Sequence, residues 1–394
     1  MVIKLVNRFL AGEYKNRSDS FIAAAADLKE SKDNVIDLSL GNPDIITEKS
    51  VIKEAARDAE AGYTKYAHPR GDKELRQEII RYYRRNYGAE IALNEMMVTV
   101  GACHGTFLAL AAVLNSGEEV IIPSPYFTPY KGQVELAGGK AVFLETKMED
   151  DFQIDPEKLE ELISDKTKVI LVNSPHNPTG VIQNKKVLKQ IVGLAEKYDL
   201  LIFSDEVYEA FDYNNKFYSL INFHQHKDRI VILNSFSKIF VMTGWRVGFV
   251  IAHPEILDTM QDINEGVCYS APSISQRAAL SALRQEKQIK NEIIITFKER
   301  VKYAWKRVKE NPYLSAAEPE GAFYLYINIK KSGFSAEDFA LKLLKDKSVL
   351  VLPGRDFGDS EGEFIRAACT LEIKELEKAF DRIDEFMQEQ IGVE

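Results

Sequence analysis

The sequence predicts an α/β protein built on a mostly parallel sheet, and three observations lead to this fold class. Short apolar runs alternate with longer helical patterns between about residues 50 and 255. The runs consist mainly of Val, Ile and Leu without strict alternation, as strands buried on both faces require. After Pro272 the pattern changes to a long charged, helical segment with fewer apolar runs. We therefore expect a three-layer α/β/α arrangement and a smaller α+β unit.

Each expected strand is a short apolar run that turn-forming residues follow in the sequence. The six runs are Met96–Val100, Glu119–Pro123, Ala141–Leu144, Lys168–Asn173, Leu200–Ser204 and Arg229–Leu233. Helical patterns, such as Phe107–Leu114 and Lys185–Tyr198, lie between them. This alternation is typical of parallel strands that helices connect and cover.

The segment after Pro272 contains the elements of the second unit. One long amphipathic stretch runs from Ser275 to Glu310, and Asn311-Pro312 ends it. The later elements are an apolar run, a helix, a strand and a terminal helix, near Gly321–Ile329, Ala336–Leu344, Ser348–Pro353 and Ile373–Gln390. A chain of 394 residues is longer than one compact core usually accommodates. We expect a large domain over residues 46–275 and a small domain formed by both chain ends, 1–45 and 276–394.

Composition and charge argue against several classes of protein. The net charge is −9 and no long basic run occurs, so nucleic acid is not an expected partner. No apolar stretch reaches the length of about 18 residues that a membrane span needs, and no signal peptide is evident, so we expect a cytoplasmic protein. Three widely separated cysteines predict neither a metal site nor a disulfide framework. No G-x-G-x-x-G motif opens a βα turn, which excludes a simple NAD-binding interpretation.

Polar and small residues follow five of the expected strands. Ligands in open α/β sheets bind beyond the carboxyl ends of the strands, so we expect these residues to meet at one edge. The five segments are Gly101–Gly105, Ser124–Phe127, Ser174–Gly180, Ser204–Tyr208 and Asn234–Lys238. Each segment alone is an ordinary turn or helix cap, and only their combination predicts a site.

The combined motifs resemble those of the class I and II aminotransferases. Ser235-Phe236-Ser237-Lys238, followed by Thr243–Gly248, is similar to the cofactor-lysine signature of that family. Asn177-Pro178-x-Gly180 and Asp205-x-x-Tyr208 stand upstream in the family's order and spacing. Further matches extend from about residue 36 to the C-terminus, at Gly41–Asp44, Lys65–Ala67 before Gly71, Gly321–Tyr324, Pro353-Gly354 and Phe364–Arg366.

The resemblance implies a pyridoxal 5′-phosphate enzyme. It would move an amino group from an L-α-amino acid, aspartate or an aromatic one first of all, to a 2-oxo acid such as 2-oxoglutarate. Lys238 resembles the family's Schiff-base lysine and would act as the catalytic base. Asp205 would keep the pyridine nitrogen protonated, because a nearby carboxylate favours the cation. Asn177 and Tyr208 would donate hydrogen bonds to the phenolic oxygen of the ring.

The resemblance also implies which residues bind the phosphate group of the cofactor. Ala102 and Cys103 open a helix, whose free N–H groups and dipole favour an anion. Ser235 and Arg246 add a hydroxyl and a guanidinium group. Tyr66 matches a tyrosine that reaches the phosphate from the partner subunit, so we expect a homodimer with shared active sites.

The remaining implied contacts concern the ring and the substrate. Phe127 matches the aromatic residue that stacks on the ring, and Tyr126 is the alternative candidate for this role. Arg366 matches the arginine that holds the α-carboxylate, with Gly41, Asn177 and Phe127 also lining the substrate site. A planar guanidinium suits a carboxylate better than an ammonium group does.

One departure and two alternatives remain at this stage. The phosphate loop carries Cys103-His104 where many relatives have Ser, Thr or Gly, and we expect these two residues to serve in packing or as pocket wall, not as a catalytic pair. The same fold and cofactor also serve β-eliminating C–S lyases, which is the alternative activity. A DNA-binding regulator on this fold would need an added module, and only about 35 residues precede the match.

Overall fold

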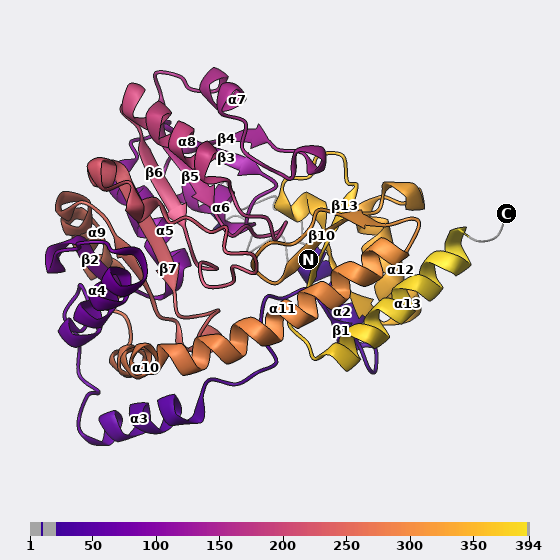
Figure 1. The fold of residues 1–394 in the computed structure, drawn as a ribbon, viewed down its shortest axis with the longest axis horizontal. Helices are drawn as coiled ribbons and strands as arrows, with labels where there is room; N and C mark the ends of the chain where they lie inside the picture. The colour runs from indigo at the N-terminus through magenta and orange to yellow at the C-terminus, as the bar shows by residue number, and fades with distance from the viewer. Residues whose placement is uncertain (1–8, 11–20, 392–394) are drawn as a thin grey trace.

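The computed structural model describes residues 9–10 and 21–391, and its largest sheet has seven strands (Figure 1). Their order is β2-β8-β7-β6-β5-β3-β4. The strands are β2 (Met96–Thr99), β3 (Glu119–Ser124), β4 (Lys140–Glu145), β5 (Thr167–Asn173), β6 (Leu201–Asp205), β7 (Ile230–Ser235) and β8 (Gly248–Ile251). The five from β3 to β7 run parallel, so the predicted α/β class is confirmed, and each of the six predicted runs is a strand.

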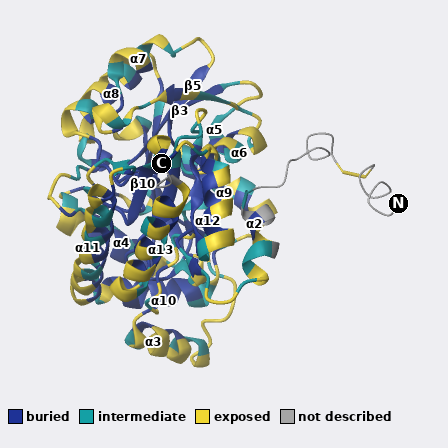
Figure 2. Cartoon of the chain, turned by 90° about the vertical axis from the view of Figure 1, so that its right-hand side faces the viewer, coloured by how far each residue is buried: buried dark blue, intermediate teal, exposed yellow. Residues whose placement is uncertain are grey.

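The sheet is buried on both faces, as the lack of alternation predicted. Within β3, Ile121 packs into one apolar cluster, and Val120 and Ile122 pack into another on the opposite side. Figure 2 shows the buried strands between exposed outer helices. The helices of this part of the chain are α3 (Lys49–Glu60), α4 (Lys73–Tyr87), α5 (Gly101–Val113), α6 (Pro129–Leu136), α7 (Pro156–Glu161), α8 (Lys185–Lys197), α9 (Pro254–Val267) and α10 (Ser273–Arg284).

Strand β8 is the main difference from the predicted sheet. It lies antiparallel between β2 and β7, so the sheet is mixed at this end. Its four residues are all buried, but a run this short follows the motif around Arg246 without a turn signal of its own. Gly248 is the first residue of the strand. A larger residue would not fit there, because its Cβ would lie 2.6 Å from the carbonyl carbon of Gly101. The strand therefore brings the Arg246 loop against the start of α5.

The C-terminal part contains a four-stranded antiparallel sheet and a two-stranded one. The strands are β1 (Ile36–Asp37), β9 (Ser315–Ala316), β10 (Tyr324–Asn328), β11 (Val349–Leu350), β12 (Leu352–Pro353) and β13 (Phe364–Ala368), and the helices are α2 (Phe21–Glu30), α11 (Glu286–Glu310), α12 (Ala336–Lys347) and α13 (Ile373–Ile391). The order of the larger sheet is β12-β13-β10-β9, and β1 pairs in parallel with β11. A segment near the N-terminus thus packs on the C-terminal part.

Two expected elements are divided in the structure. The stretch from Ser275 to Glu310 breaks at Gln285, whose ψ of 14° interrupts the helical path between α10 and α11. The expected strand Ser348–Pro353 becomes β11 and β12, which belong to different sheets. Residues 1–8 and 11–20 of the predicted small domain lie outside the described residues, and the domain boundaries stay a prediction. Among the described residues, no helix has the length and apolarity needed to cross a membrane.

Candidate active site

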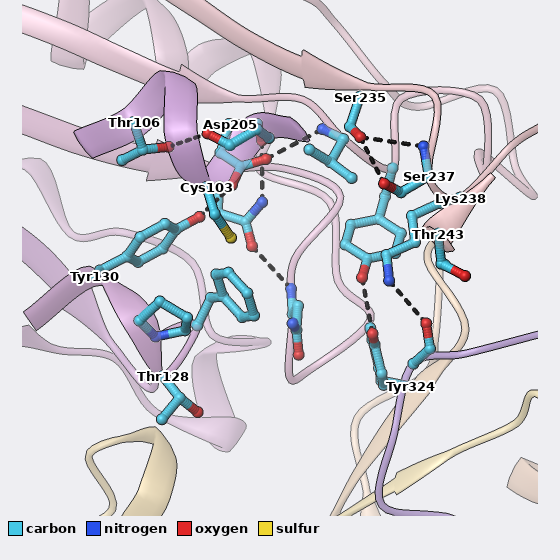
Figure 3. A pocket seen from close by; sticks show the side chains of 18 of the residues that line it. Cys103, Thr106, Thr128, Tyr130, Asp205, Ser235, Ser237, Lys238, Thr243 and Tyr324 are labelled. Atoms are coloured by element: carbon cyan, nitrogen blue, oxygen red, sulfur yellow. Dashed lines mark hydrogen bonds between the residues drawn. The ribbon is translucent and has the colours of Figure 1, made fainter. Parts of the chain in front are cut away.

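A cavity of about 450 Å³ opens beyond the carboxyl ends of β5, β6 and β7. All predicted site residues except Tyr66 line this cavity: Lys238, Asp205, Tyr208, Asn177, Ala102, Cys103, Phe127, Ser235, Arg246, Arg366 and Gly41. Figure 3 shows several of them pointing toward one another from different strands and loops. The five strand ends therefore do converge on one site, as parallel strand topology requires.

Lys238 stands just after β7, and its amine reaches across the cavity. The Nζ atom donates a hydrogen bond of 2.7 Å to the backbone oxygen of Gly41, in the segment after β1 (Figure 3). The side chain is half-buried, so the amine is held inside the cavity and not in bulk solvent. The only described hydrogen-bond partner of this amine is a backbone carbonyl, which leaves its charge without a paired carboxylate.

Asp205 is the last residue of β6 and is buried. Its Oδ1 accepts a 3.1 Å hydrogen bond from the backbone N–H of Val207, and its Oδ2 accepts a 2.5 Å bond from the hydroxyl of Tyr130 on α6. Burial raises the pKa of Asp205, while the bond from Tyr130 and the positive charge of Lys238 act in the opposite direction. No pattern in the sequence pointed to Tyr130, because a buried tyrosine in a helix is ordinarily a core residue.

Asn177 and Tyr208 contribute an amide and a hydroxyl to the same region. The Oδ1 atom of Asn177 accepts a 3.1 Å hydrogen bond from Nη1 of Arg366, so its NH₂ group is the part left to donate elsewhere. The hydroxyl of Tyr208 lies 2.8 Å from that of Tyr324. Burial, and then the neighbouring Tyr324, raise the pKa of Tyr208, so this hydroxyl stays protonated.

An anion-binding cradle forms where α5 begins. The helix has no side-chain cap, so the first backbone N–H groups, at Ala102 and Cys103, are free to bind a ligand. Gly101 has a φ of +77°, and a Cβ there would lie 2.7 Å from Nη2 of Arg246. Ser235 also lines the cavity, and its hydroxyl lies 2.8 Å from that of Ser237 and 3.0 Å from the backbone oxygen of Val247. Backbone donors, a hydroxyl and a guanidinium group together match a phosphate group.

Arg366 is buried on β13, and its guanidinium group lies between two aromatic rings. The guanidinium carbon is 4.6 Å from the ring centroids of both Tyr324 and Phe357. Its Nη2 donates to the backbone oxygen of Ser39, and Nη1 donates to Asn177. Its Nε, although buried, has no hydrogen-bond partner in the described part of the chain. Burial lowers the pKa of Arg366, and the nearby tyrosines and Asp356 oppose this effect.

The structure separates the two candidates for the ring-stacking residue. Phe127 lines the cavity, whereas Tyr126 does not. The ring of Tyr126 instead stacks on that of Phe143, with a centroid distance of 5.0 Å.

Cys103 and His104 also point apart. Burial raises the pKa of the Cys103 thiol, and Nδ1 of His104 accepts a 3.1 Å hydrogen bond from the backbone N–H of Val100. This geometry forms no thiolate–imidazole pair.

Tyr66 lies outside the cavity. Its side chain is 89% exposed and contacts Tyr269 edge to face at a centroid distance of 5.3 Å. Residues that line the cavity but had no predicted role are Leu40, Thr106, Thr128, Pro129, Tyr130, Asn173, Val207, Ser237, Thr243, Tyr324, Leu352 and Asp356. Within residues 9–10 and 21–391, no group of three or more His, Cys, Asp or Glu side chains is placed to hold a metal ion.

Together these features define an α/β enzyme whose cavity combines a lysine, a buried carboxylate, an anion cradle and a buried arginine. The family model "Aminotransferase class I and II" matches residues 33–383. The chain belongs to this family and is an aminotransferase.

Individual relatives agree with the family assignment. The chain is 37% identical to an aspartate aminotransferase of Pyrococcus horikoshii over 359 residues, 90% of this chain and 91% of the relative. An aspartate aminotransferase structure from Thermotoga maritima has a TM-score of 0.91 and 36% identity, covering 96% of this chain and 100% of that one. An aromatic aminotransferase structure from Pyrococcus horikoshii has a TM-score of 0.87 and 35% identity, covering 92% and 98%.

Proposed function

We propose that this aminotransferase uses pyridoxal 5′-phosphate, held by Lys238, to move an amino group from an L-α-amino acid to a 2-oxo acid. The observation that carries the proposal is the convergence of Lys238, Asp205 and the α5 cradle on one cavity. The donor set fits the cofactor, because an aldehyde-reactive amine, a buried carboxylate and a phosphate-sized anion site lie together. When bound, the cofactor supplies an electron sink for the substrate's Cα.

Different residues of the protein would bind the phosphate group and the pyridine nitrogen of the cofactor. The N–H groups of Ala102 and Cys103, with Ser235 and Arg246, would bind the phosphate. Asp205 would hold a proton on the pyridine nitrogen, and its bond from Tyr130 keeps the carboxylate in one orientation. Asp205 is buried, and low exposure to water strengthens its interaction with a nearby positive charge.

The ring's remaining contacts come from three further side chains. Asn177 and Tyr208 would donate hydrogen bonds to the phenolic oxygen, and Phe127 would stack on the ring. Once released from the cofactor, the amine of Lys238 would act as a base: it would take a proton from the substrate and later return one. Its hydrogen bond to the oxygen of Gly41, a neutral acceptor, supports this role because no carboxylate holds the amine in place.

Arg366 would bind the α-carboxylate of the substrate. Its unpartnered Nε and its planar shape suit bidentate binding of a carboxylate. We propose that the side chain of the amino acid is aromatic or that of aspartate, the classes for which the relatives are named. Among the described residues, the cationic ones that line the cavity are Lys238, Arg246 and Arg366, and each has a role above. An aromatic side chain needs no further cation, whereas aspartate needs one that these described lining residues do not supply.

We also propose a homodimer with shared active sites, located in the cytoplasm. The exposed Tyr66 and its neighbour Tyr269 support the dimer, because two adjoining aromatic rings at a surface commonly pack against another protein. Tyr66 would then reach the phosphate of the partner's site.

The central test is spectroscopic. Purified protein with the cofactor should absorb visible light as a lysine-bound cofactor does, and Lys238→Ala should remove that band. Lys331→Ala, which changes an exposed lysine outside the cavity, is the matched control and should retain it. Protein that stays colourless with added cofactor would overturn the proposal.

A second assay separates transamination from β-elimination. Aspartate, phenylalanine, tyrosine and a cysteine conjugate would each be tested with 2-oxoglutarate. We expect glutamate to form with aspartate or an aromatic amino acid. Release of ammonia and pyruvate without amino transfer would favour the C–S lyase alternative.

A further inference from the structure

We propose that Tyr324 is a positioning residue that directs the hydroxyl of Tyr208 toward the cofactor's phenolic oxygen. This inference rests on the proposed function, in which Tyr208 donates to that oxygen. Tyr324 was part of a matching motif in the sequence, but nothing there gave its side chain a role. The structure places it at the floor of the cavity, on β10, 2% exposed.

The first observation is the contact between the two hydroxyl groups. Their oxygens lie 2.8 Å apart, and the residues come from distant parts of the chain, Tyr208 from the turn after β6 and Tyr324 from β10 (Figure 3). Each hydroxyl has only one proton to donate. If Tyr208 donates its proton to a ligand, its oxygen must accept from Tyr324. A ligand oxygen in the cavity therefore fixes the direction of both bonds.

The second observation is that the hydroxyl of Tyr324 has little freedom to turn elsewhere. Among the described hydrogen bonds, Tyr208 is its only partner. On the other side it touches the backbone at Gly41, where a Cβ would overlap the hydroxyl. Gly41 in turn accepts the hydrogen bond from Lys238. The absence of a side chain at Gly41 thus lets Tyr324 reach Tyr208.

The third observation ties Tyr324 to the carboxylate site. Tyr326 pairs with Arg366 across β10 and β13, so Tyr324, two residues along, faces the same side of the sheet. The guanidinium carbon of Arg366 lies 4.6 Å from the ring centroid of Tyr324. The face of the Tyr324 ring therefore packs against Arg366, and the hydroxyl of the same residue contacts Tyr208. Tyr324 thus connects the proposed carboxylate site with the proposed contact to the phenolic oxygen.

This arrangement has a measurable consequence. A hydroxyl that accepts a hydrogen bond becomes a stronger donor, because bonds in a chain polarise one another. Tyr208 therefore stabilises negative charge on the phenolic oxygen more strongly when Tyr324 donates to it. A better-stabilised oxygen holds the proton on the adjoining Lys238 nitrogen less tightly. Removing the Tyr324 hydroxyl should make this nitrogen more basic.

The experiment is a pH titration of the visible absorption of the lysine-bound cofactor in the holoenzyme. In Tyr324→Phe the transition should move to higher pH, with the proton dissociation constant of that nitrogen falling about threefold. The aromatic ring stays, so packing against Arg366 is preserved. Tyr326→Phe is the matched control, since Tyr326 is buried on the same strand but does not line the cavity. It should leave the transition unchanged.

A double-mutant cycle separates positioning from packing. If Tyr324 acts through Tyr208, Tyr324→Phe should shift the transition in the native background but not in the Tyr208→Phe background. An equal shift in both backgrounds, no shift at all, or a shift of the same size from Tyr326→Phe would overturn the inference. Failure of the native protein to form any lysine-bound absorption would instead refute the proposed function.

Discussion

The hydroxyl of Tyr130 donates a 2.5 Å hydrogen bond to Oδ2 of Asp205, and both groups are buried. Asp205 accepts a second bond from the N–H of Val207, so both carboxylate oxygens have a donor. The carboxylate therefore has one fixed orientation beside the cavity. In the proposed function, such support would matter because Asp205 would have to face a particular ring atom.

Replacing Tyr130 by Phe should reduce kcat about tenfold. The Asp205 carboxylate would lose one stabilising donor, and its pKa would rise further, so less of it would be ionised beside the cofactor. Steady-state kinetics with the preferred amino acid would measure the loss. Tyr126→Phe, next to the same loop but outside the cavity, should keep native kcat. Equal effects of both variants would contradict a role for Tyr130.

Replacing Arg366 by Lys should raise KM for the amino acid about a hundredfold, because an ammonium group cannot form the planar bidentate contact. Binding of the cofactor should change little, since Arg366 is not in the α5 cradle. The control is Arg355→Lys, on the adjoining loop, where the side chain is 72% exposed. Native KM in Arg366→Lys would show that the carboxylate binds elsewhere.

Replacing Gly101 by Ala should weaken binding of the cofactor about tenfold, which corresponds to the loss of one charge-assisted hydrogen bond. The new Cβ would lie 2.7 Å from Nη2 of Arg246 and would displace the guanidinium group. Gly117→Ala is a matched control, because Gly117 also has a positive φ, +82°, but has open space around its Cβ position. Both variants carry backbone strain, and only Gly101→Ala should raise the dissociation constant in a cofactor titration.

His176 should make stability fall at low pH. Its ring is buried against the hydroxyl of Thr179, and burial lowers its pKa to about 4 from an ordinary value of 6.5. A base with a lowered folded-state pKa binds fewer protons when folded. Its contribution to stability is therefore present above about pH 6.5 and is lost as the pH falls toward 4.

The loss can be measured by urea unfolding across this pH range. The native protein should lose more of its free energy of unfolding than His176→Gln between pH 6.5 and 4, by up to about 3 kcal/mol. His224→Gln replaces an exposed histidine and should follow the native curve. Parallel curves for the native protein and His176→Gln would refute the role of His176.

The elements predicted best were those with a strong local pattern. The six apolar runs became strands because continuous Val, Ile and Leu segments have few alternatives to burial on both faces. β8 was missed because four residues carry too little pattern. The two-sheet division of Ser348–Pro353 was also missed, because it depends on pairing with two strands far away in the chain, β1 for one half and β13 for the other.

For the site, the sequence by itself predicted that Asp205 and Lys238 share one edge of the sheet, because both stand at the ends of parallel strands. The role expected of Arg366, which lies within β13 of the other sheet, came from the resemblance to the family. Only the tertiary structure decided how they are supported. Tyr130 and Tyr324 are ordinary core aromatics in the sequence, and no local pattern distinguishes a buried tyrosine that packs from one that donates. Their roles depend on hydrogen bonds to Asp205 and Tyr208, 75 and 116 residues away in the chain. Contacts at such separation arise from chain folding and have no signature in local periodicity.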